Sequence, residues 1–234
     1  MTMTPDPLLQ CRGLRKCFIT RGREVCVLGS VDLAVRAGEV VVIRGRSGAG
    51  KSTLLGLLGG LERPTSGSVL LGSERLEALS ASALASLRRR RIGIIFQSHN
   101  LLPSWTAREN VEAALMHAGV PAGARRARAA GLLKALGLED RLGYLPAELS
   151  VGQQQRVAIA RALVNEPSVI LADEPTGDVD PETAAEIVSL LTAPVHERGV
   201  ALVVATHGAF PLDGADRVCH LEGGRLIGGD GLDR

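Results

Sequence analysis

Residues 45–53 constrain this chain more than any other feature. Their sequence is GRSGAGKST, and it follows a β-branched run at residues 40–43 and precedes an apolar, helix-like segment at residues 54–61. A strand, a glycine-rich loop and a helix in this order are the context of a phosphate-binding P-loop. Glycines let the backbone turn tightly, the loop amides form a concave anion site, and the helix start adds positive charge. We therefore predict that this loop binds nucleotide phosphates.

Two side chains of the loop add to the backbone site. Lys51 supplies a point charge for the β- and γ-phosphates, and Ser52 offers a hydroxyl to Mg²⁺, which prefers oxygen ligands. A glycine-rich turn without a phosphate is the alternative. The full G-x-x-x-x-G-K-S pattern between a strand and a helix disfavours that alternative.

Length and charge limit the class of protein. A chain of 234 residues suits one large α/β domain or one domain with an inserted subdomain. Its net charge of +2 gives no support for nucleic-acid binding, so we expect no nucleic-acid partner. No apolar run approaches the ~18–20 residues that cross a bilayer, and residues 1–10 lack the basic and apolar parts of a secretory signal. We expect a cytosolic location.

The four cysteines give no sign of a metal or redox motif. They are Cys11, Cys17, Cys26 and Cys219, and their spacing fits neither a zinc site nor a C-x-x-C pair. In a cytosolic chain we expect buried or half-buried thiols.

The chain reads as a sheet interrupted by a helical segment. Residues 8–18 and 25–35 predict two antiparallel strands joined by a turn. Further strands are expected at residues 68–72, 92–96, 168–172 and 200–205, helices at 79–87, 105–116, 122–138, 157–164 and 182–197, and a terminal hairpin at 215–229. We interpret residues 98–165 as a mainly helical subdomain, inserted in an α/β core of residues 1–97 and 166–234. The basic run at residues 88–91 is interpreted as a solvated helix end, with anionic lipid or an acidic partner loop as the alternative.

Two strand ends carry candidate catalytic groups. In parallel α/β sheets ligands bind at the carboxyl ends of the strands. Asp173 and Glu174 follow an apolar strand, where Asp173 can hold Mg²⁺ and Glu174 can orient or deprotonate an attacking water. His207 follows the next apolar strand and could reach a γ-phosphate. The alternatives are two acids in a surface turn and a structural histidine.

Two further features suggest nucleotide contacts. Residues 149–156, LSVGQQQR, lie before a strong helix, and Ser150 is an N-cap residue type, so a second anion site is possible at this helix start. Phe18 lies near a turn of the first strand pair. It is either an ordinary packed side chain or a platform for a purine base, a kind of contact that contributes ~1–3 kcal/mol.

The ordered set of motifs resembles the ATP-binding cassette of ABC transporters over nearly the whole chain. The set comprises the P-loop, Gln97 after a strand, L-S-x-G-Q at residues 149–153, Asp173-Glu174, Asp180 and His207. The L-S-x-G-Q element is decisive because other P-loop families lack it. The resemblance implies an α/β P-loop NTPase fold with a RecA-like core, a mostly parallel sheet, a small N-terminal antiparallel β subdomain and the inserted helical subdomain.

The resemblance also implies roles for individual residues. Glu174 would be the general base, Gln97 would contact Mg²⁺ and the attacking water, and His207 would hold the γ-phosphate. Mg²⁺ would be bound by Ser52, Gln97 and Asp173. Contacts to ATP would come from Phe18, Gly45, Arg46, Ser47, Gly48, Ala49, Gly50, Lys51, Ser52 and Thr53, and across a dimer from Ser150, Gly152, Gln153 and Asp180.

The implied assembly is a head-to-tail dimer with two-fold symmetry that encloses two ATP molecules. The second subunit would be another copy of this chain or a related cassette, and a membrane-spanning permease subunit would hold the pair at the cytoplasmic face of the membrane. Within the family, residues 59–67 and 96–103 look most like the lipoprotein-release and macrolide-export branch. That likeness implies ATP hydrolysis coupled to export or to lipid or lipoprotein extraction.

Other readings stay open at this point. An ATPase that drives a signalling complex regulating cell-wall enzymes is the alternative within the family. Soluble cassettes of DNA repair or translation would need a long coiled-coil insertion or a second cassette, and a small-molecule P-loop kinase would lack L-S-x-G-Q.

Two positions depart from the family pattern. Val151 replaces the first glycine of the usual Gly-Gly pair, and Gly208 stands where the family often has Asp. If the backbone at position 151 needs a positive φ, a β-branched residue is strained there. We then expect a working but slower site.

Overall fold

The computed structural model describes residues 6–208, 210–211 and 214–228. Parts of two sequence predictions lie outside these residues. They are the first residues of the N-terminal segment that we judged not to be a secretory signal, and Gly229 at the end of the predicted terminal hairpin.

A mostly parallel sheet forms the centre of the molecule. Its strand order is β10-β9-β3-β8-β7-β6, and all neighbours are parallel except the β9–β10 hairpin. The strands are β3 (Val40–Arg44), β6 (Ile92–Ile95), β7 (Val169–Asp173), β8 (Ala201–Thr206), β9 (Arg217–Glu222) and β10 (Arg225–Ile227). The carboxyl ends of β3, β8, β7 and β6 therefore lie side by side at one edge, where ligands bind in sheets of this kind.

Successive side chains of the central strands point to opposite faces of the sheet, so the core consists of two apolar clusters. Val41 and Ile43 of β3 belong to one apolar cluster, whereas Val40 and Val42 belong to the other. Strands β7 and β8 alternate in the same way. Both faces of the sheet are thus buried, which explains why these strands are continuous apolar runs.

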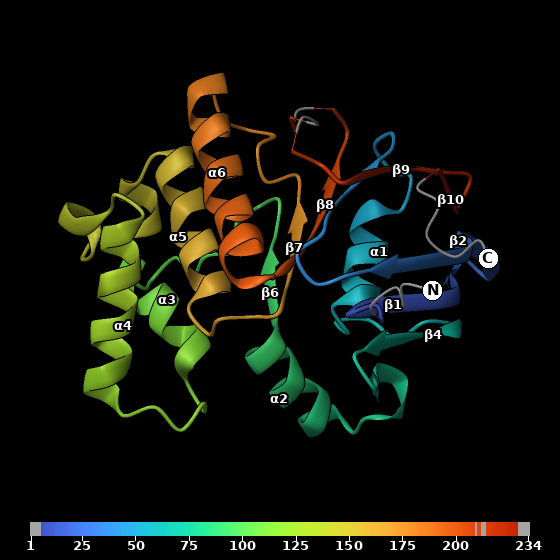
Figure 1. Cartoon of the computed structure of the whole chain (residues 1–234), viewed down its shortest axis with the longest axis horizontal. Coiled ribbons are helices and arrows are strands. Elements are labelled where there is room, and N and C mark those ends of the chain that lie inside the picture. The colour runs from blue at the N-terminus through green and yellow to red at the C-terminus, as the bar shows by residue number, and fades with distance from the viewer. Residues whose placement is uncertain (1–5, 209, 212–213, 229–234) are drawn as a thin grey trace, which may run out of the picture.

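A second, antiparallel sheet covers one face together with helix α1 (Lys51–Leu58). Its order is β2-β1-β4-β5, formed by β1 (Leu9–Thr20), β2 (Arg23–Val35), β4 (Ser66–Leu71) and β5 (Glu74–Arg75). Figure 1 shows this sheet at one end of the molecule and the helices α3 to α5 at the other. Helix α1 contacts β7, β8 and β1, so it lies between the two sheets.

The remaining helices contact one another or the strands β6 and β8. Helices α3 (Ala107–Leu115), α4 (Ala122–Ala135) and α5 (Val151–Leu163) contact one another, and α6 (Pro181–Arg198) contacts α5 and β8. Helix α2 (Ala81–Arg91) contacts β6, and short 3-10 turns occur at Leu76–Ala78, Glu139–Arg141 and Pro146–Glu148. Between β6 and β7 the described chain contains helices and no strand.

The architecture confirms the predicted α/β P-loop fold with a small antiparallel sheet near the N-terminus. The helix boundary that differs most from the prediction is the start of α5. Helix α5 begins at Val151 rather than at residue 157, because Ser150 and Gln153 form a capping box that starts the helix six residues earlier. The L-S-x-G-Q stretch is therefore the first turn of a helix and not a loop before it.

The basic run at residues 88–91 is not simply a solvated helix end. Arg88 donates to the carbonyl of Gly60 at 2.8 Å, and Arg89 donates to the carbonyl of His117 at 2.7 Å. Arg90 is the exposed member of the run. Long arginine side chains reach across to neighbouring loops and satisfy their carbonyls, a role that composition alone does not reveal.

The expectation for the cysteines holds for two of the four. Cys11 and Cys219 are buried free thiols, whereas Cys17 and Cys26 form a disulfide between β1 and β2. The two sulfurs meet because Cys17 and Cys26 are directly opposed in the strand pair.

No helix within the described part of the chain combines the length and the apolar composition that a bilayer crossing requires.

Candidate nucleotide-binding site

The candidate site is a cavity of about 400 Å³ at the carboxyl edge of the central sheet. It is lined by the second half of the P-loop and by groups from the three neighbouring strand ends. The lining residues are Val27, Ser47, Gly48, Gly50, Lys51, Ser52, Thr53, Gln97, Asp173, Glu174 and His207. The seven residues from Lys51 to His207 in this list were all predicted from the sequence to contact ATP or Mg²⁺ or, for Glu174, to act as the general base, and four separate segments supply them.

The loop geometry favours an anion. Gly50 is the N-cap of α1 with φ at 99°, and no side chain caps this helix start. A Cβ on Gly50 would lie 2.8 Å from Val27 and 3.2 Å from Leu28, so only glycine fits both the space and the backbone angle. The first amides of α1 are left for a ligand, as in phosphate sites at helix N-termini.

Lys51 is held at the base of the cavity. Its side chain is 7% exposed, and its Nζ donates to the carbonyls of Gly45 at 2.9 Å and Arg46 at 3.3 Å. It also lies 3.4 Å from Oε1 of Glu174. The ammonium group is therefore fixed by three oxygen partners beside the start of α1, where a phosphate would bind.

Glu174 has an unusual backbone and a fixed side chain. Its φ is 47°, in the left-handed region that a non-glycine residue rarely occupies. His207 donates from Nδ1 to Oε2 of Glu174 at 2.9 Å and from its backbone amide at 3.1 Å. Burial raises the pKa of Glu174, but these hydrogen bonds and the charges of His207 and Lys51 outweigh it, so the net pKa is lowered.

The pKa of Asp173 is shifted in the opposite direction to that of Glu174. Burial raises its pKa, a hydrogen bond with Ser52 lowers it, the neighbouring Glu174 raises it, and the result is a raised pKa. Among the described residues Oδ1 of Asp173 is buried without a hydrogen-bond partner. A buried, unpartnered carboxylate oxygen beside a serine hydroxyl is a donor set that fits Mg²⁺.

The structure does not bring every predicted residue to this cavity. Gly45, Arg46 and Ala49 line a neighbouring cavity of about 410 Å³ between the loop and the end of β9. Phe18 is 38% exposed with Lys16 Nζ 4.8 Å from its ring centroid, and it is absent from the lining. The β1–β2 hairpin instead reaches the cavity through Val27, which no sequence pattern singled out.

The residues predicted to act across a dimer gather elsewhere. Ser150 accepts from the amide of Gln153 at 3.3 Å, and Gln153 accepts in return from the amide of Ser150 at 3.0 Å. Asp180 caps α6 and accepts from the Thr183 hydroxyl at 2.7 Å. A Cβ on Gly152 would lie 2.8 Å from Thr183, so Gly152 permits the close approach of the two helix starts.

The condition for strain at Val151 is not met. It is the first residue of α5 and is not among the described non-glycine residues with positive φ. A β-branched side chain is therefore unstrained at this position. It is also 45% exposed, so it makes little packing contact.

Sequence reasoning also missed Arg161. Its guanidinium donates to the carbonyls of His99 at 2.5 Å and Asn100 at 2.6 Å, in the loop that follows Gln97. Both loop residues have positive φ, 57° and 48°. A single arginine within the apolar run of α5 was the available signal, because a cation there needs specific acceptors.

Comparisons with known proteins identify the family of this chain. The chain matches the ABC transporter family over residues 28–177. The macrolide export ATP-binding/permease protein MacB of Brucella melitensis is 47% identical over 96% of this chain and 35% of its own length. The lipoprotein-releasing system ATP-binding protein LolD of Syntrophotalea carbinolica is 45% identical over 94% of this chain and 97% of its own length. This chain spans about a third of the length of the MacB relatives.

Solved structures give the same result. The dimeric ATP-binding cassette MJ0796 in a post-hydrolysis state, bound to ADP and Pi, superimposes with a TM-score of 0.87 at 37% identity. The match covers 97% of this chain and 99% of that one. The P-loop, the strand-end acids and the capped L-S-x-G-Q helix thus occur together in a fold shared with known cassettes, and the chain belongs to the ABC transporter family as an ATP-binding cassette domain.

Proposed function

We propose that the chain binds ATP and hydrolyses it to ADP and phosphate, and that it couples this cycle to a membrane-spanning partner. The observation that carries the proposal is the convergence of Lys51, Gln97, Asp173, Glu174 and His207 on one cavity beside the P-loop. The reaction needs positioning and charge stabilisation more than covalent chemistry.

Each group has a role that fits its environment. Lys51 and the amides at the start of α1 bind the phosphates. Glu174 accepts a proton from the attacking water, and its lowered pKa keeps it ionised at neutral pH. His207 orients Glu174 through Nδ1, which leaves Nε2 for the γ-phosphate.

Ser52, Gln97 and Asp173 are the residues that would hold Mg²⁺. When bound, Mg²⁺ neutralises charge on the phosphates. The unpartnered Oδ1 of Asp173 supports this assignment.

We further propose that two cassettes associate head to tail, with a second copy of this chain or a related cassette. Ser150, Gly152, Gln153 and Asp180 are absent from the lining of the cavity, yet they lie on two adjacent helix starts. In an isologous pair each subunit would present these starts to the ATP of the other. The similar cassette MJ0796 is described as dimeric, which supports this arrangement.

The membrane-spanning partner is proposed to dock on a groove of about 280 Å³ between α2, β6 and α5. Leu61, Ile94 and Phe96 give it an apolar floor, and Arg88 and Arg161 give it charge. Phe96 directly precedes Gln97, so a partner seated there would sense the cavity. We propose that residues 98–165 move as a helical unit that transmits the closure.

This assembly would lie at the cytoplasmic face of the membrane. The names of the relatives, macrolide export and lipoprotein release, support export or lipoprotein extraction over the signalling alternative. Co-purification of the tagged chain with a membrane protein in mild detergent tests the partner.

The variant Glu174→Gln tests the reaction. We expect ATP binding to persist, hydrolysis to fall ~10²–10⁴-fold, and an ATP-dependent dimer to accumulate in size-exclusion chromatography. Glu197→Gln changes an exposed glutamate at the end of α6 and should leave all three unchanged. Wild-type turnover by Glu174→Gln would remove the role assigned to Glu174.

A further inference from the structure

We propose that Cys17 and Cys26 form a reversible redox modification site that sets the affinity of the cassette for nucleotide. The proposal rests on the nucleotide site and the cytoplasmic location proposed above. The reaction partners would be low-molecular-weight disulfides and thiols.

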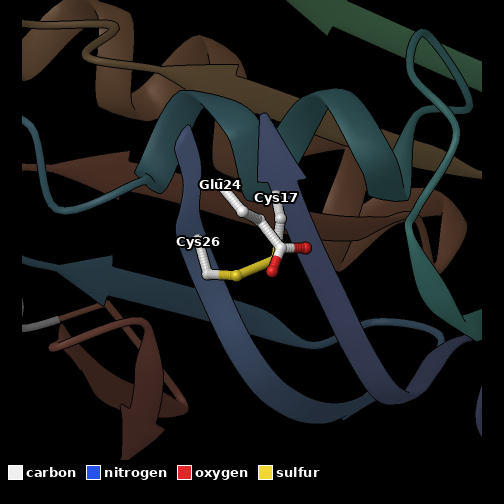
Figure 2. Close-up of side chains that lie close together, drawn as sticks. All are labelled: Cys17, Glu24 and Cys26. Carbon is white, nitrogen blue, oxygen red and sulfur yellow. A yellow bond between two sulfur atoms is a disulfide. The ribbon is translucent and has the colours of Figure 1, made fainter. Parts of the chain in front are cut away.

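The cysteine pair is accessible. Cys17 on β1 is half-buried and Cys26 on β2 is exposed, and Figure 2 shows their disulfide bridging the two strands beside Glu24. The other two cysteines, Cys11 and Cys219, are buried and free. At the cytoplasmic face small thiols keep accessible disulfides exchanging, so a disulfide there is switchable more than structural.

The disulfide adjoins the part of the hairpin that reaches the nucleotide cavity. Lys16 pairs with Leu28, but the next residue, Cys17, pairs with Cys26, so Val27 is an extra residue in β2. Such a bulge re-aims a side chain and increases the local twist. Val27 lines the cavity and lies against the P-loop, 2.8 Å from the position of a Cβ on Gly50.

Phe18 lies on the other side of the same junction. It directly follows Cys17 and pairs with Val25. The disulfide therefore fixes the register on one side of the bulge and ties together the two strands that carry Phe18 and Val27. Without the disulfide, only the hydrogen bonds of an exposed hairpin end would hold the strand segments that carry Phe18 and Val27 together.

The surroundings of Cys26 favour thiol exchange. Arg15 donates to Sγ of Cys26 at 3.2 Å, and a cation at this distance stabilises a thiolate. Glu24 would oppose this effect, but it lies 3.6 Å from Arg15 and is partly neutralised. Sγ of Cys17, Sγ of Cys26 and a carboxylate oxygen of Glu24 lie within 4.8 Å of one another. In the oxidised form these atoms are not a metal site, because the two sulfurs are bonded to each other.

Oxidation of the cysteine pair takes place in two thiol–disulfide exchange steps. The Cys26 thiolate attacks a small disulfide RSSR, forms a mixed disulfide and releases one RS⁻. The Cys17 thiolate then attacks the Cys26 sulfur, forms the Cys17–Cys26 bond and releases the second RS⁻. Two protein thiols are oxidised and RSSR is reduced to two RSH, and excess thiol reverses both steps.

The oxidised form should bind nucleotide more tightly, because its hairpin contacts are ordered before the ligand arrives. We expect reduction to raise the dissociation constant for ADP about three- to tenfold. ADP is the probe because it contains the base and is not turned over.

The test is calorimetry of ADP binding after treatment with oxidised glutathione or with excess reduced thiol. Peptide mass spectrometry should find a Cys17–Cys26 crosslink in the first sample and none in the second. The double variant Cys17→Ser with Cys26→Ser should bind ADP as the reduced wild type does under both treatments. It retains Cys11 and Cys219, so it also reports any response of the buried thiols.

Several results would overturn the proposal. They are an uncrosslinked pair after oxidation, an ADP affinity that is equal in both redox forms, or a double variant that still responds. In each of these cases ADP binding itself remains, and the proposed function stands. If ADP binds neither form, the proposed function fails.

Discussion

Two helices of this molecule begin at candidate anion sites, and they begin in different ways. Helix α1 follows Gly50, has no side-chain cap, and opens into a cavity that already holds Lys51 and the strand-end acids. Helix α5 follows Ser150, is closed by a reciprocal capping box with Gln153, and has an exposed start. The first helix start leaves its amides to a ligand, whereas the second satisfies part of its own.

This difference supports the proposal that one chain supplies the P-loop and all candidate catalytic side chains of one site, here called the complete site, and the partner-facing groups of another. The start of α1 has a buried cation, a candidate base and candidate metal ligands within the same chain. The start of α5 has a hydroxyl, an amide side chain and little else to bind a triphosphate. In the proposed head-to-tail pair, a second subunit would supply the missing groups.

The largest expected effect is at the complete site. Lys51→Ala removes the buried cation and also leaves Glu174 without the ion pair at 3.4 Å. We expect ATPase activity to fall about 10²–10³-fold, because one preorganised charge at the reacting group is lost. The control is Lys134→Ala, which removes an exposed lysine that pairs with Glu139. Tight ATP binding by Lys51→Ala in equilibrium dialysis would contradict the comparison.

The next effect separates capping from ligand binding. Ser150→Ala and Thr106→Ala each remove the N-cap of a capping box, on α5 and on α3. Each should destabilise its helix by about 1 kcal/mol, or about 2–4 °C in Tm. Only Ser150→Ala should lose ATP-dependent dimerisation and about tenfold or more in ATPase rate. Equal losses in both variants would mean that Ser150 acts by capping alone.

A third effect concerns stability and compares two adjacent acids. The pKa of Asp173 is raised, so its ionised form opposes folding at neutral pH, and this penalty disappears below its unfolded pKa. The pKa of Glu174 is lowered, so its contribution is present above its unfolded pKa and is lost as pH falls through its folded value. Without added nucleotide or Mg²⁺, Asp173→Asn should therefore raise Tm at pH 7 and Glu174→Gln should lower it. Differential scanning calorimetry measures both, and shifts of the same sign would contradict this assignment.

The complete site could largely be predicted from the sequence because its signals are local. A glycine-rich loop with Lys51 follows one strand, acids follow another, and His207 follows a third. The strand-end rule then brings them together without knowledge of the packing. The sequence could not show that Lys51 pairs with Glu174 or that His207 holds the same carboxylate, since these contacts join residues 123 and 33 positions apart.

The surroundings of the site were harder to predict, because they depend on a strand irregularity and on contacts between residues far apart in the sequence. The disulfide depends on a bulge at Val27 that shifts the register of β2, and alternation in sequence does not reveal one extra residue. Arg161 reaches the loop after Gln97 across 61 and 62 residues. The early start of α5 depends on the capping box, which overrides the modest helix propensity of Val151.

The smallest expected effect is at Val151, where strain would require a positive φ and the structure has an ordinary first helical residue. Val151→Gly should therefore not accelerate hydrolysis, and the ATPase rate should stay within about twofold of wild type. The added backbone freedom should lower the stability of the fold by about 0.5 kcal/mol. Ala81→Gly makes the same kind of change at the exposed first residue of α2 and controls for this loss. A clear gain in ATPase rate for Val151→Gly, absent in Ala81→Gly, would show that the start of α5 adopts another backbone during turnover and that the partner-facing groups are remodelled when the pair closes.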